Sequence, residues 1–231
     1  MQGSGKTAAV HKLSEIYPTY KAVEEGAYSP AELAWCAYMD IRTFGEMRDK
    51  YSGLRGQREK NTVCEGDRRV VCYTKIITDN REFYKDFEQY EIYNNRVSFE
   101  DFKAIVLSCF KAWDQDDMIF ECALFQNIVE DMILFRCFSN HEITEFYRLI
   151  RNAPAGKDYR ILYLKTEDVK DSIEFIRKER SDDSGHELWF PMMIGYFNDS
   201  PYAKQKDRSK QSPADRDRYA LESRKNTFLI K

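Results

Sequence analysis

The chain has 231 residues, of which 42% are hydrophobic and 32% charged, and its formal net charge is −3. This length can bury a substantial core, and we expect one α/β domain of ordinary soluble composition. With 36 basic and 39 acidic residues there is no basic excess, so neither a nucleic-acid polymer nor a membrane is an expected partner. No run approaches 18 apolar residues, and no secretory signal peptide is visible.

The six cysteines never form a C-x-x-C pair, and most lie within apolar stretches. This usage is typical of buried, reduced thiols in a cytoplasmic protein, and it disfavours a disulfide framework or a zinc site. The three histidines are scattered along the chain, which gives little support to a histidine-based metal site.

The N-terminal residues Gly3, Ser4, Gly5, Lys6 and Thr7 match the end of the phosphate-binding P-loop pattern G-x-x-x-x-G-K-[ST]. In this pattern backbone N–H groups surround phosphate oxygens, the lysine reaches the outer phosphates, and the last hydroxyl holds Mg²⁺. The first glycine of the pattern and the strand before it do not appear in the sequence. We therefore expect the chain to be truncated within the motif, with apolar residues ending in glycine encoded just upstream.

The residues that follow favour a P-loop over the alternatives, which are a linker scar or a chance match. Apolar residues recur at helical spacing at Ala9, Leu13, Ile16 and Tyr17, and Pro18 ends the pattern. A helix starting directly after the loop adds its dipole and its unpaired N–H groups to an anion site.

Two short apolar segments end in acids. Residues 20–23 are predicted to form a strand followed by Glu24 and Glu25, and residues 118–120 one followed by Glu121. In open α/β sheets ligands bind at the carboxyl ends of the strands, so these carboxylates are expected near the P-loop.

Several further segments have recognisable local signals. A capping box at residues 29–32 predicts a helix whose apolar face carries Asp40 at or near its edge, either solvated or as a substrate ligand. Residues 45–60 are polar and are expected to form a mobile connection. The sequence further predicts a hairpin over 62–74 and helices over 80–93, 98–113, 124–135 and 139–150. A strand is predicted over 159–164, followed by helices over 166–176 and 186–205. Residues 227–230 are either the beginning of a final strand or a frayed end.

With its P-loop, its strand-end acids and a basic segment at Arg177, Lys178 and Arg180, in this order, the chain resembles the P-loop kinases of nucleosides and nucleoside monophosphates. Deoxynucleoside kinases and thymidylate kinases are the nearest groups. The resemblance implies a three-layer P-loop NTPase fold with a parallel sheet, whose central first strand is missing. It also implies a single domain over residues 1–231, with a small hairpin and helical insertion on the substrate side at 45–100 and a lid at about 177–187.

The resemblance also implies a role for each candidate residue. The P-loop residues would bind ATP, with Lys6 acting on the transferred phosphate, and Thr7 and Glu121 would hold Mg²⁺. Glu25, or its neighbour Glu24, would act as the base toward the acceptor. The lid arginines would neutralise the phosphoryl group; the alternative for them is a solvated helix end.

The expected function is phosphoryl transfer from Mg-ATP to a nucleoside, nucleotide or similar small acceptor. The alternatives are a P-loop ATPase or nucleotide switch, and a degenerate fragment without catalysis. A switch is less favoured because the sequence lacks an apolar run ending in aspartate and has only Met118-Ile-Phe-Glu121. Glu121 is followed by Cys122, not by the acid–arginine pair of many nucleoside kinases, which leaves the acceptor open. Assembly into a homodimer is also left open.

Overall fold

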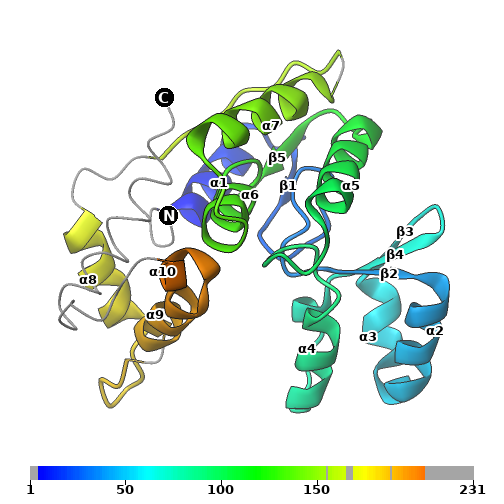
Figure 1. The fold of residues 1–231 in the computed structure, drawn as a ribbon, viewed down its shortest axis with the longest axis horizontal. Coiled ribbons are helices and arrows are strands. Elements are labelled where there is room, and N and C mark those ends of the chain that lie inside the picture. Colours follow the sequence, from blue (N-terminus) through cyan, green and yellow to red (C-terminus); the bar gives the residue numbers. More distant parts are fainter. Residues whose placement is uncertain (1–4, 155, 165–168, 188, 206–231) are drawn as a thin grey trace.

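The structure is a computed structural model that describes residues 5–154, 156–164, 169–187 and 189–205 (Figure 1). It is a mixed α/β protein with a small parallel sheet, a small antiparallel sheet and several helices. The predicted loop residues Gly3 and Ser4 and the predicted C-terminal strand at 227–230 lie outside the described residues.

The helices and strands alternate along the described part of the chain. They are α1 (Lys6–Ile16), β1 (Lys21–Val23), β2 (Ala37–Asp40), α2 (Ile41–Lys50), η1 (Ser52–Leu54), α3 (Arg55–Lys60), β3 (Thr62–Glu65), β4 (Arg68–Val71), η2 (Tyr73–Lys75), α4 (Arg81–Glu88), α5 (Phe99–Ala112), β5 (Met118–Phe120), α6 (Gln126–Glu130), the π-helical turn η3 (Asp131–Phe135), α7 (Asn140–Asn152), α8 (Val169–Glu179), α9 (Trp189–Asp199) and α10 (Pro201–Gln205).

The two strands that were predicted to end in acids pair in parallel, β1 with β5, so that Lys21 faces Met118 and Val23 faces Phe120. The pairing extends at the carboxyl end, where the Glu121 N–H donates to the Val23 carbonyl at 2.9 Å. Helix α1 packs against both strands. A parallel α/β arrangement is thus present, but two strands do not define three layers, and the three-layer P-loop fold stays a prediction.

The predicted hairpin is confirmed. Strands β3 and β4 pair antiparallel around a turn at Gly66, which has a positive φ of 56°, and β2 adds to the other edge of β4. Helices α2, α3 and α4 lie beside this sheet at the lower right of Figure 1. Its core contains buried residues of the sheet, of α2 and α4, and of the turns that follow α2 and β4: Ala37, Met39, Met47, Tyr51, Val71, Tyr73, Ile76, Phe83 and Phe87.

The prediction of a helix starting at the Ser29–Glu32 capping box is wrong, because no helix forms between β1 and β2. The hydroxyl of Ser29 accepts from the Ala31 N–H at 3.1 Å, and a Glu32 carboxylate oxygen accepts from the Ala34 N–H at 2.8 Å. Glu32 is also buried and accepts a hydrogen bond from the Tyr93 hydroxyl. This long-range contact overrides the local capping signal, and the following residues become β2.

Residues 45–60, predicted as a polar connection, form the end of α2, η1 and α3 instead. Arg58 explains part of this difference. Its side chain is buried, and its guanidinium donates to the Tyr51 carbonyl at 2.9 Å. Asp40 is the N-cap of α2, where its carboxylate accepts from the Thr43 N–H at 2.7 Å, so it serves the helix start.

The strand predicted over residues 159–164 is not formed. This stretch has no regular secondary structure, and Ile161, Leu162 and Tyr163 are 53%, 64% and 50% exposed. Figure 1 shows it running back beside α7. A strand requires a hydrogen-bonded neighbour, and within the described ranges β5 pairs only with β1.

The larger core joins α5, α6, η3 and α7, as their amphipathic patterns predicted. Its buried side chains include Phe102 and Val106 of α5, Ile128 of α6 and Phe146 of α7. Ser98 caps α5, and Ser139 and Glu142 form the predicted capping box of α7. In the part of the chain that the structure describes, no helix is long and apolar enough to cross a membrane.

Candidate functional site

Helix α1 begins as the P-loop pattern requires, immediately after Gly5. Gly5 has a left-handed φ of 78°, a conformation that glycine adopts without strain, and its carbonyl accepts the first helical hydrogen bond from the Ala9 N–H at 2.9 Å. The helix predicted from the apolar spacing before Pro18 is confirmed, since α1 ends at Ile16. Ile16 and Tyr17 are about half exposed, and Val10 is the buried residue.

Thr7 and Glu121 meet at the carboxyl end of β5. The Thr7 hydroxyl donates to Glu121 Oε1 at 2.6 Å, across 114 positions of sequence. The other carboxylate oxygen, Oε2, accepts from the backbone N–H of Glu25 at 3.2 Å. The start of α1 and the ends of β1 and β5 are therefore joined through one carboxylate, which is 8% exposed.

The Glu25 side chain is held by three donors from two other segments. Its Oε1 accepts from Trp35 Nε1 at 3.2 Å and from Gln126 Nε2 at 3.1 Å. Its Oε2 lies 3.2 Å from Cys122 Sγ, whose thiol donates. These three contacts hold the Glu25 carboxylate in one orientation. The neighbouring Glu24 has a different environment, because its carboxylate lies 3.4 Å from His11 Nε2 in an exposed pair.

The backbone around this cluster is unusual. Trp35, Cys122 and Leu124 have positive φ values of 64°, 58° and 77°, a region that residues with side chains seldom occupy. Each such residue costs on the order of 1–3 kcal/mol and persists only where its surroundings enforce it, and such residues concentrate at functional sites. Tyr147 helps to enforce the turn, since its hydroxyl donates to the Leu124 carbonyl.

The site has more negative than positive charge. Glu25, Glu121 and burial raise the pKa of the Cys122 thiol, with burial the largest cause, whereas the positive charge of Lys6 lowers it. Lys6, the first residue of α1, thus adds positive charge to the surroundings of this cluster. The thiol stays protonated at neutral pH and serves as a hydrogen-bond donor to Glu25.

The donor set fits Mg²⁺ bound together with a nucleotide. Thr7 and Glu121 offer a hydroxyl and a carboxylate oxygen, and Mg²⁺ prefers oxygen ligands, taking one or two from protein and the rest from phosphates and water. Among the residues that the structure describes, no group of three His, Cys, Asp or Glu side chains could hold a metal alone.

The predicted lid arginines lie in the helical hairpin formed by α8 and α9. Arg177 pairs with Glu187 through Nε at 3.0 Å and Nη2 at 2.8 Å, and its guanidinium lies 4.6 Å from the Phe190 ring centroid. Arg180 lies 5.3 Å from the Trp189 ring centroid. The contacts described for both arginines stay within this hairpin, and none joins them to Thr7, Glu25 or Glu121.

Sequence reasoning identified Thr7, Glu25 and Glu121 but missed the residues that surround Glu25. Cys122 and Gln126 follow Glu121 closely, but the segment between them is apolar and gave no signal of a polar contact with Glu25. The contact of Trp35 with Glu25 could not be predicted, because residues 29–36 were expected to form a helix and do not.

No protein-family model, no curated protein and no solved structure matches this chain.

Proposed function

We propose that the chain binds Mg-ATP through the start of α1 and transfers its terminal phosphoryl group to a small acceptor. The observation that carries this proposal is the 2.6 Å hydrogen bond from Thr7 to Glu121. A hydroxyl that gives its proton to a carboxylate keeps its lone pairs available for a cation, as the last residue of a P-loop requires.

The chain's own residues would have separate tasks. The N-terminus of α1 and Lys6 would bind the phosphates, since helix N–H groups and an ammonium favour negative charge. Thr7 and Glu121 would hold Mg²⁺, which neutralises phosphate charge when it is bound. Glu25, oriented by Trp35 and Gln126, would accept the proton of the attacking hydroxyl.

Arg177 and Arg180 remain candidates for the lid. Closure of the hairpin over the phosphates would bring their charges to the transferring group. An arginine in such a position can contribute about 10³–10⁵ in rate where it has been measured. This closure would require Arg177 to exchange Glu187 for a phosphate oxygen.

An acceptor screen with γ-labelled ATP tests the function. We expect label to pass to a nucleoside, a nucleotide or a related hydroxyl or phosphate compound, and Lys6→Ala to abolish the transfer. Transfer to water alone would assign the chain to the ATPases, and full activity of Lys6→Ala would refute the phosphate role of this lysine.

A further inference from the structure

Cys36 and Cys72 lie opposite each other, one residue beyond the ends of two paired strands. Strand β2 pairs antiparallel with β4 so that Ala37 faces Val71, which sets Cys36, directly before β2, against Cys72, directly after β4. Their Sγ atoms are 3.6 Å apart, across 36 positions of sequence. The two sulfurs are therefore in direct contact across the small antiparallel sheet.

The backbone around the pair is compatible with a covalent link. The Cys36 N–H donates to the Leu33 carbonyl at 3.2 Å, and the Cys72 N–H donates to the Asn61 carbonyl at 2.8 Å. Since neither N–H is used between the two cysteines, they form a non-hydrogen-bonded cross-strand pair. In such pairs the Cα atoms are about 4.5 Å apart, which is within the range of roughly 4.4–6.8 Å that disulfides span.

Closing the bond requires only a small movement of the sulfurs. An S–S bond is about 2.05 Å long, so the two Sγ atoms must approach each other by about 1.5 Å. Other buried thiols of the chain have carboxylates as neighbours instead. Cys109 Sγ lies 3.9 Å from a Glu65 carboxylate oxygen, and Cys122 donates to Glu25.

The two thiols of the pair differ in acidity. The Cys36 thiol donates to Cys72 Sγ, and this hydrogen bond raises the pKa of Cys36 and lowers the pKa of Cys72. The Tyr28 N–H and the positive charge of Lys75 also lower the pKa of Cys72, whereas burial opposes them. The thiolate is the attacking form in thiol–disulfide exchange, so Cys72 is the sulfur that reacts first.

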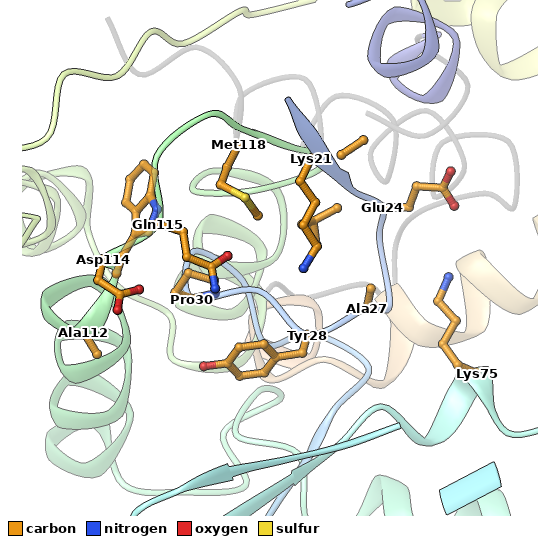
Figure 2. Close-up of a pocket in the computed structure, with 13 residues that line it drawn as sticks. Lys21, Glu24, Ala27, Tyr28, Pro30, Lys75, Ala112, Asp114, Gln115 and Met118 are labelled. Carbon is orange, nitrogen blue, oxygen red and sulfur yellow. The ribbon is translucent and has the colours of Figure 1, made fainter. Parts of the chain in front are cut away.

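A reagent reaches Cys72 through a local opening of the surrounding structure, because Cys72 is 3% and Cys36 1% exposed. Tyr28 and Lys75, the two residues that act on Cys72, line a cavity of about 410 Å³ beside β1. Figure 2 shows Lys75 extending from its helical turn into this region, with the Tyr28 ring on the other side of Ala27. Solvent in the cavity is thus separated from Cys72 by few residues, and local openings require less free energy than global unfolding.

We infer that Cys36 and Cys72 are a reversible redox pair, which exchange with a small-molecule disulfide closes to a protein disulfide and which thiols open again. The Cys72 thiolate attacks one sulfur of the reagent, the S–S bond of the reagent breaks, and one reagent thiolate leaves with the electron pair. Cys36 then gives its proton to solvent and attacks the Cys72 sulfur of this mixed disulfide, and the second reagent thiolate leaves. Two protein thiols are oxidised, and one reagent disulfide is reduced to two thiols.

The link ties the start of β2 to the end of β4 and closes the chain between them into a loop. A disulfide of this kind stabilises a protein mainly by restricting its unfolded state. The oxidised chain should therefore unfold at a higher urea concentration than the reduced chain. This inference does not depend on ATP binding, and its test needs no nucleotide.

Equilibration of the full chain with mixtures of 2-hydroxyethyl disulfide and 2-mercaptoethanol tests the inference. After acid quenching, the remaining thiols are alkylated in denaturant, and peptide mass spectrometry locates each disulfide. We expect a peptide linked through Cys36 and Cys72 to predominate in the most oxidising mixture and to disappear with excess dithiothreitol. Refolding from urea in the same mixtures should give the same linked fraction, because an equilibrium does not depend on the direction of approach.

Variants assign the effect to this pair. Cys36→Ser and Cys72→Ser should each abolish the difference in urea midpoint between oxidising and reducing conditions. Cys109→Ser removes another buried thiol and is the matched control, which should keep both the link and the difference. Thermal unfolding checks that each variant is folded. Absence of the linked peptide from both the folded and the refolded parent chain, or a predominant disulfide between other cysteines, would overturn the inference.

Discussion

The backbone N–H of Glu25 donates to Glu121 Oε2 at 3.2 Å, so the ends of two parallel strands share one carboxylate. The opposite oxygen of that carboxylate accepts from Thr7 at 2.6 Å. Glu121 therefore fixes the relative positions of the start of α1 and of Glu25, in addition to its proposed role toward Mg²⁺.

Replacing Glu121 with glutamine should separate these two roles. The amide keeps the shape and one carbonyl acceptor but removes the negative charge that favours a divalent cation. We expect ATP affinity in Mg²⁺ to fall by about tenfold or more, with ATP affinity in EDTA nearly unchanged. Titration calorimetry under both conditions measures this difference. Equal losses with and without Mg²⁺ would assign Glu121 to structure alone.

Glu32 should make stability depend on pH. Burial is the main cause that raises its pKa from the ordinary 4.5 to about 7, and its Oε2 has no hydrogen-bond partner among the described residues. Between these two values the folded protein keeps a proton that the unfolded chain has lost. The free energy of unfolding should therefore fall by about 3 kcal/mol as pH rises from about 4.5 to 7.

Glu32→Gln isolates this contribution, because the amide does not titrate. Urea unfolding at pH 5 and pH 8 should show that the variant gains stability relative to the parent chain at the higher pH. A stability difference between the two proteins that stays constant with pH would contradict the assignment.

The buried pair of Arg136 and Asp131 should be sensitive to removal of one partner. Their Nε and Oδ2 atoms are 2.6 Å apart, and both side chains are at most 2% exposed. Arg136→Met leaves the Asp131 carboxylate buried without its cation, which typically costs about 3–5 kcal/mol. Adding Asp131→Asn should recover part of that loss. Urea unfolding of the single and double variants compares them, and equal stability of the two would contradict this account.

The capping box of α7 offers a simpler test. Ser139 accepts from the Glu142 N–H, and the Glu142 carboxylate accepts from the Ser139 N–H at 2.8 Å. Ser139→Ala should lower the free energy of unfolding by about 1 kcal/mol. Ser184→Ala, in the exposed turn after α8, is the matched control and should have almost no effect in the same urea titration.

Two identical local signals show how far the sequence could predict the fold. Ser139 with Glu142 and Ser29 with Glu32 both have capping-box spacing, but only the first starts a helix. Glu142 is solvent-exposed and has only local partners, whereas Glu32 is buried against Tyr93, 61 positions away. In this pair of signals the local pattern predicted the helix whose cap has only local partners, and failed where a distant side chain competed.

The same distinction holds at the candidate site. Thr7, Glu25 and Glu121 were predictable because a loop motif and parallel strand ends place residues by general rules. The partners of Glu25 were not, because Trp35 and Cys122 reach it through left-handed backbone conformations. A tryptophan in a sequence does not indicate a positive φ, because at such a residue the surrounding structure imposes that conformation.

Titration of the chain with ATP in the presence of Mg²⁺ tests the central claim most directly. We expect the parent chain to bind ATP more tightly with Mg²⁺ than with EDTA, and Thr7→Ala to lose this Mg²⁺ dependence with a roughly tenfold or greater loss of affinity. Thr19→Ala, an exposed threonine in the turn before β1, should bind like the parent chain. Undiminished Mg-ATP affinity in Thr7→Ala, or no ATP binding by the parent chain, would contradict the proposed phosphate site.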